Sequence, residues 1–164
     1  MRKVVKMGPT TLGAALEREH HEIDEWIEGF DSDRLDDRER VESLRRAIGA
    51  LRRHIYLEEE FLFPPMEADL AIPTMVMLRE HGEIWRRLDA IEATLDGDGS
   101  EDSLTPACRE LLVLLAAHNG KEEPIFYGAA DATLSAAENA ELKELIDSGR
   151  MPEGWVCRQA GVGC

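Results

Sequence analysis

The sequence has few cysteines, few basic residues and no long apolar run, and each shortage excludes a class of protein. Its 164 residues include three cysteines, an odd number that does not form the disulfide framework of a small secreted domain. The 19 Lys and Arg are outnumbered by 34 Asp and Glu, and the formal net charge is -15. Nucleic acids and anionic membranes both require a cationic surface, so we expect neither as a partner.

Neither a membrane-spanning segment nor a signal peptide is expected in this sequence. No apolar run approaches the length that spans a bilayer. Gly8-Pro9 interrupts the basic segment at the N-terminus before the apolar core of a signal peptide forms. We therefore expect a cytoplasmic protein.

What the sequence does contain is apolar residues that recur every three or four positions, with no competing strand pattern. Four such stripes with short connections predict an all-α fold, an up-down-up-down four-helix bundle. The first helix is expected to begin at Thr10 or Thr11 and end at Gly29. The second is expected to begin at the capping box of Asp36 and Glu39 and to be broken or ended by Pro64-Pro65. The third is expected to carry Pro73 in its first turn and to end at the loop 97–100, and the fourth to begin at Thr105-Pro106.

A short fifth helix is expected from Ser135, which forms a second capping box with Glu138, to about Ser148. A chain of this length is expected to form one domain. Its parts are an N-terminal arm (residues 1–9), the bundle with the short helix (10–148) and an irregular, cysteine-containing tail (149–164).

A histidine and a glutamate four residues apart occur twice, as His54 with Glu58 and as His118 with Glu122. Residues at this spacing lie one above the other on a helix, with about 5–6 Å between their Cβ atoms. An imidazole and a carboxylate at that separation can hold one transition-metal ion. Two copies therefore suggest two ions or one pair of ions.

Each of these pairs follows a related segment that contains one more histidine. Residues 18–23 match residues 79–84 at five of six positions, with His20 equivalent to His81. His20 lies 34 residues before His54, and His81 lies 37 residues before His118. This spacing fits two helical hairpins whose second helices return to the height of the first histidine.

All six of these side chains lie on core-facing stripes that contain no Lys or Arg. A single histidine in an apolar stripe is more often a hydrogen-bonded core residue, and Glu58–Glu60 alone would be a solvated face. Together, however, two unpaired buried carboxylates would cost several kcal/mol each. Bound cations remove that cost, and this donor set suits iron, manganese, cobalt or zinc. The predicted metal ligands are His20, His54, Glu58, His81, His118 and Glu122.

The number of ligands suggests a reaction. If Glu58 and Glu122 each bridge two ions, each ion has two imidazoles, two carboxylate oxygens and an oxo or hydroxo bridge. An octahedral ion then keeps one position for dioxygen, peroxide or nitric oxide. The neighbouring side chains are rotated by about 100° or more from the ligands and are expected at the surface or behind them. These neighbours are His21, Glu59, Glu60 and Glu123.

These motifs resemble the hemerythrin-like (HHE cation-binding) family over roughly residues 10–148. The residues that carry the resemblance are Glu19-His20, His54 with Glu58-Glu59 and Leu62-Phe63-Pro64, Glu80-His81, and His118 with Glu122-Glu123 and Phe126-Tyr127. The resemblance implies a centre of two iron ions with an oxo or hydroxo bridge, for which manganese or zinc could substitute, held by the six residues named above. The set of four histidines and two glutamates resembles most closely that of di-iron proteins that repair damaged iron centres. Oxygen-carrying hemerythrins differ, since they have a further histidine where this chain has Met77.

The leading hypothesis is a di-iron protein that binds or reacts with O₂, peroxide or NO in oxidative or nitrosative stress protection or sensing. Whether it is an oxidoreductase stays open. One alternative is iron binding, iron delivery or iron–sulfur centre repair, with an iron-acceptor or electron-donor protein as partner. Another is a regulatory module that uses the metal only to stabilise the bundle.

Three smaller expectations complete the analysis. Pro124 cannot donate a hydrogen bond to the Gly120 carbonyl, so we expect a distorted helix over residues 118–128. Cys108, Cys157 and Cys164 are expected to be free thiols, with a redox-active pair in the tail as the alternative. Trp26, Trp85, Tyr56 and Tyr127 are expected to be core or boundary aromatics.

Overall fold

The fold is described by a computed structural model, which covers residues 10–97 and 101–161. Two of its rods are single helices, α1 (Leu12–Gly29) and α4 (Ala71–Asp96). The second rod joins α2 (Asp37–Leu57), the π-helical turn η1 (Glu58–Leu62) and α3 (Phe63–Met66). The fourth joins α5 (Glu101–Glu122), the π-helical turn η2 (Glu123–Tyr127) and α6 (Gly128–Thr133). The expected arm at residues 1–9, residues 98–100 of the expected loop and Cys164 lie outside the described part.

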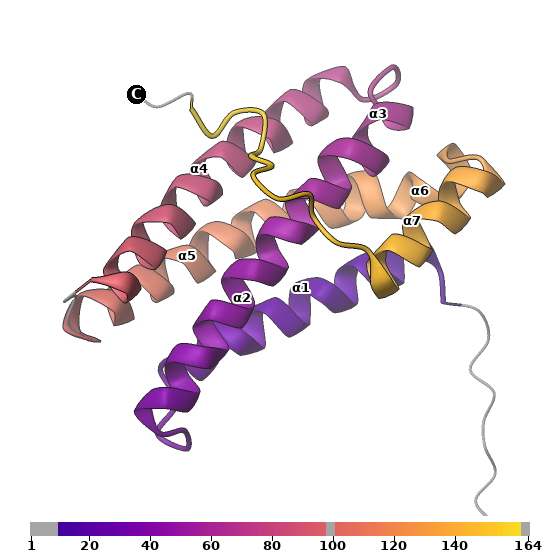
Figure 1. Ribbon diagram of the computed structural model, residues 1–164. Coiled ribbons are helices and arrows are strands. Elements are labelled where there is room, and N and C mark those ends of the chain that lie inside the picture. Colours follow the sequence, from indigo (N-terminus) through magenta and orange to yellow (C-terminus); the bar gives the residue numbers. More distant parts are fainter. Residues whose placement is uncertain (1–9, 98–100, 162–164) are drawn as a thin grey trace, which may run out of the picture.

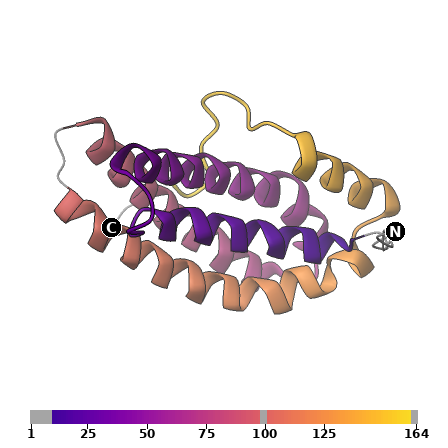
Figure 2. The ribbon, with the colours of Figure 1, turned by 90° about the horizontal axis from the view of Figure 1, so that it is seen from below.

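The rods form the predicted up-down-up-down bundle (Figure 1). Sequential rods pack as hairpins, α1 against α2 and α4 against α5, and contacts of α2 with α4 and of α1 with α5 close the ring. The short fifth helix, α7 (Ala136–Ser148), packs at one end against α1 and α2 (Figure 2). No strand occurs in the described ranges, and no helix within them is long and apolar enough to cross a membrane.

Three of the predicted helix starts are confirmed by their caps. The Thr11 hydroxyl accepts from the Ala14 N–H at the start of α1. Asp36 exchanges hydrogen bonds with Glu39 at the start of α2, as a capping box should. Ser135 and the residue three positions later do the same at the start of α7.

The fourth rod begins earlier than predicted, at Glu101 instead of Thr105-Pro106. Leu104 is buried in the core, so the extra turn buries an apolar side chain. Pro106 therefore lies inside the helix and leaves the Asp102 carbonyl without its usual donor, a modest cost so near a helix end.

The prolines that follow the two His–Glu pairs lie in or directly after π-helical turns. Of the two predicted effects of Pro64-Pro65, a break or an end of the helix, the structure shows a break: a π-helical turn precedes the prolines, and the rod remains helical to Met66. The Phe63 N–H reaches back five residues to the Glu58 carbonyl, so the prolines occupy the first turn of α3, where a missing N–H is tolerated. The predicted distortion at Pro124 is confirmed, because η2 includes this residue.

The apolar core is divided into two clusters. One is built around Phe30, Leu44, Leu88 and Leu111, and the other around Leu12, Leu62, Met77 and Phe126. On each rod the predicted ligand histidine lies between residues of the two clusters. A polar layer therefore crosses the bundle between them.

The tail after α7 runs across the second rod to α4 (Figure 1). Arg86 donates to the carbonyls of Gln159 at 3.1 Å and Ala160 at 3.4 Å. The buried Cys157 thiol donates to the His81 carbonyl, with 3.7 Å between sulfur and oxygen. Cys108 and Cys157 are free, and burial raises the pKa of the first thiol to about 11 and of the second to about 12. Both are therefore protonated thiols at neutral pH.

Gly82 is the position where the tail approaches α4 most closely, because a Cβ there would lie 2.5 Å from the Gln159 carbonyl oxygen. We expect Gly82→Ala to be less stable than Gly120→Ala by about 1–3 kcal/mol, since it forces the tail off the helix. Gly120 is a matched control, as a Cβ there meets nothing within 4 Å. Urea unfolding of both variants measures the difference, and equal stability would contradict the described packing.

Candidate metal centre

The polar layer consists of one histidine from each rod and one glutamate from each of the second and fourth rods. Their side chains are at most 4% exposed. The structure brings together all six residues that the sequence singled out, in two groups whose donor atoms lie within 4.8 Å of one another. The first group is His20, His54, Glu58 and Glu122, and the second is His81, His118, Glu58 and Glu122.

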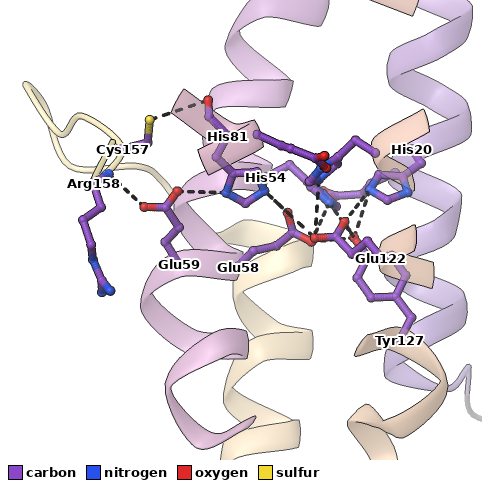
Figure 3. Close-up of polar contacts among 12 residues, drawn as sticks. His20, His54, Glu58, Glu59, His81, Glu122, Tyr127, Cys157 and Arg158 are labelled. Carbon is purple, nitrogen blue, oxygen red and sulfur yellow. Dashed lines mark hydrogen bonds and ion pairs between the residues drawn. The ribbon is translucent and has the colours of Figure 1, made fainter. Parts of the chain in front are cut away.

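The two carboxylates belong to both groups, and each directs one oxygen to each group. Figure 3 shows Glu58 and Glu122 beside each other in the middle of this layer. Every histidine faces them with Nε2. The distances are 3.5 Å from Glu58 Oε2 to His54, 3.3 Å from Glu58 Oε1 to His81, 3.4 Å from Glu122 Oε1 to His20 and 3.6 Å from Glu122 Oε2 to His118.

The outward-facing Nδ1 atoms of the histidines meet a second set of carboxylates. Three of these contacts are hydrogen bonds, His54 to Glu19 at 3.1 Å, His81 to Glu59 at 2.8 Å and His118 to Glu80 at 2.9 Å. The fourth is longer, 3.7 Å from His20 to Glu123. A carboxylate on Nδ1 fixes the ring orientation and leaves Nε2 free to bind a cation.

These outer carboxylates follow the internal repeat. The glutamate before each lone histidine, Glu19 or Glu80, bonds the later histidine of its own half. Glu59 and Glu123 lie behind the lone histidine of the other half, as expected for residues behind the ligands. The expected surface positions also hold, because Glu60 and His21 are exposed. Sequence reasoning gave no role to the first two glutamates, although their identical place in both halves was a usable signal.

Two segments near the C-terminus support these outer carboxylates. Arg53 donates to the carbonyls of Leu145, Ile146 and Gly149 at the end of α7, and also to Glu19 at 2.6 Å. The Arg158 backbone N–H in the tail donates to Glu59 at 2.9 Å. α7 is thus connected to His54 through Arg53 and Glu19, and the tail is connected to His81 through Glu59.

Tyr127 also belongs to the polar layer, although the sequence analysis placed it only in the core or at its boundary. It is buried, and its hydroxyl donates to Glu58 at 2.6 Å or Glu122 at 2.9 Å and lies 2.9 Å from Nε2 of both His20 and His54. In a regular α-helix, Tyr127 would lie about 140° around the axis from Glu122. The π-helical turn η2 adds one residue to the turn and rotates the phenol back into the bundle.

The histidines and carboxylates shift one another's pKa. Burial lowers the pKa of His118, but Glu122 and Glu80 outweigh it and raise that pKa to about 10. Burial raises the pKa of Glu122, but His118 and His20 hold it well below its ordinary value. The pKa of Glu80 falls to about 2, chiefly through its hydrogen bond from His118.

Some inward-facing atoms have no hydrogen-bond partner among the described residues. They are His81 Nε2 and Glu122 Oε2, both in the second group. A buried acceptor without a partner carries a substantial desolvation cost, which a bound cation relieves. The donor set of imidazole nitrogen and carboxylate oxygen is therefore suited to metal binding.

A protein-family comparison agrees with this chemistry. The family model for the hemerythrin HHE cation binding domain matches residues 11–130. The chain belongs to the hemerythrin family. Searches of curated proteins and of solved structures found no match. The matched residues include all six predicted ligands and Tyr127, whereas α7 and the tail lie beyond them.

Proposed function

We propose that this hemerythrin-family protein holds two iron ions and binds or reacts with O₂, peroxide or NO, as a stress-protective or sensing protein. The observation that carries the proposal is the position of Glu58 and Glu122, each of which directs one oxygen to each pair of histidines. Two carboxylates arranged in this way can bridge a pair of cations.

The residues fit such a pair. His20 and His54 would hold one ion and His81 and His118 the other, each through Nε2, with Glu58 and Glu122 shared. Carboxylate and imidazole suit iron, and manganese or zinc can occupy the same donors. When bound, iron supplies one-electron chemistry and an affinity for small diatomic or peroxide ligands.

The chain's own residues orient the donors and limit the access of water. Glu19, Glu59 and Glu80 hold three of the imidazoles by Nδ1. The two apolar clusters enclose the polar layer from both sides, which strengthens electrostatic interactions within it. A hollow of about 600 Å³ lies on the surface between α1 and η2 and includes Tyr127 in its lining, but none of the six predicted ligands.

The reaction is tested by loading the protein anaerobically with Fe(II) and adding O₂, hydrogen peroxide or NO. We expect oxidation or ligand binding to change both the optical and the Mössbauer spectra of stoichiometrically loaded protein. Stable iron without any spectral change would contradict the proposed reactivity. Transfer of that iron to an apo-acceptor protein would then support delivery or repair instead.

Metal binding should also release protons. With its pKa at about 10, His118 carries a proton at pH 7 in chelator-stripped protein, and coordination requires the neutral ring. We expect at least one proton per chain when Zn(II) is added in weak buffer with a pH indicator. His21→Gln should release the same number, since His21 is exposed. Stoichiometric binding without proton release would contradict a protonated His118 in the metal-free protein.

Replacing Glu59 tests the outer carboxylates. We expect Glu59→Gln to weaken metal binding by about 10–100-fold, because the charge that holds His81 is lost. Glu60→Gln is the control, since Glu60 is exposed and contacts the Trp155 indole instead of a histidine. Chelator competition compares the variants, and equal losses in both would show that the hydrogen bond to His81 has no role.

A further inference from the structure

The two halves of the repeat differ at one aromatic position. Tyr127 lies five residues after Glu122, and Phe63 lies five residues after Glu58. Each ring lies beside the lone histidine of the other half. The centroid of Tyr127 is 5.2 Å from that of His20, and that of Phe63 is 5.5 Å from that of His81. The two positions therefore share their surroundings, but only Tyr127 brings a hydroxyl.

That hydroxyl contacts all four residues of the first group. It lies 2.9 Å from His20 Nε2 and His54 Nε2, and 2.6 and 2.9 Å from the two shared carboxylates. No equivalent hydroxyl serves the second group, where His81 Nε2 has no hydrogen-bond partner among the described residues. The phenol oxygen thus lies in the space that a cation of the first group needs.

The phenol has little room to leave this place. Its side chain is 3% exposed, with the His20 ring on one side. On its backbone side, α1 packs so closely that a Cβ at Gly13 would lie 2.6 Å from the Tyr127 carbonyl oxygen and 3.4 Å from the Tyr127 Cβ. Metal–oxygen distances of about 2.0–2.2 Å require only a small shift of a hydroxyl that already touches the other donors.

We propose that Tyr127 is a seventh protein ligand, which binds through its phenolic oxygen to the ion held by His20 and His54. This inference rests on the proposed di-iron function and makes the two metal positions unlike, one with a phenolate and one without. The phenol proton is lost to solvent when the oxygen coordinates, and no electron is transferred. The His81–His118 position is then the more open to a small ligand.

The chain suits a spectroscopic test because it contains only two tyrosines, Tyr56 and Tyr127. Tyr56 packs against Phe61 and Trp155, with ring centroids 5.8 and 5.2 Å away. The protein is loaded with iron and oxidised to Fe(III), and iron per chain is counted before each spectrum. We expect a phenolate-to-iron charge-transfer band in the visible region of the wild type and of Tyr56→Phe. Tyr127→Phe should lose the band while it retains iron.

Resonance Raman spectra of the wild type give a readout that needs no variant. Excitation in the band should enhance tyrosine ring modes, and these should shift when tyrosine is ring-deuterated. A wild type that holds two ferric ions without such modes would overturn the role of Tyr127 and leave the di-iron proposal intact. A band that persists in Tyr127→Phe would also overturn it. Failure of the wild type to bind iron would overturn the proposed function and this inference with it.

Discussion

The structure depends on the burial of two carboxylates, Glu58 and Glu122, inside an apolar bundle. Four imidazoles surround them, and their mutual effects shift the pKa values in opposite directions, down for Glu122 and up to about 10 for His118. Positive charge is therefore required at the centre, whether it comes from protons on the imidazoles or from metal cations. The division of the core into two apolar clusters and the outer carboxylates both follow from accommodating this polar layer.

The internal repeat explains most of the arrangement, and its deviations indicate where function could be specialised. Each half supplies a lone histidine and a His–Glu pair, and each lone histidine has a carboxylate behind it. The halves differ in the contacts of that carboxylate. Glu59 accepts a hydrogen bond from a backbone N–H of the tail and lies 2.8 Å from His81 Nδ1, whereas Glu123 lies 3.7 Å from His20 Nδ1. They differ again at Phe63 and Tyr127. A symmetric scaffold thus holds two inequivalent positions.

The sequence predicted the bundle and the six clustered residues because both depend on helical periodicity. Three features of the structure were not predicted from the sequence, each for a physical reason. The extra turn at the start of α5 depends on tertiary burial of Leu104, which overrides the turn signal of Pro106. Tyr127 reaches the polar layer because of a π-helical turn, in which successive residues are separated by a smaller rotation than the 100° of a regular α-helix. The contact of the Arg158 N–H with Glu59 is made by backbone, so no side-chain pattern records it.

The central claim is that a pair of cations replaces the protons in this polar layer. Metal analysis of the purified chain tests it most directly, after anaerobic loading with Fe(II) and removal of excess metal by gel filtration. The account predicts two ions per chain in the wild type and tight binding of about one in His54→Ala, which removes a donor from the first group only. A wild-type count of one or none would contradict it.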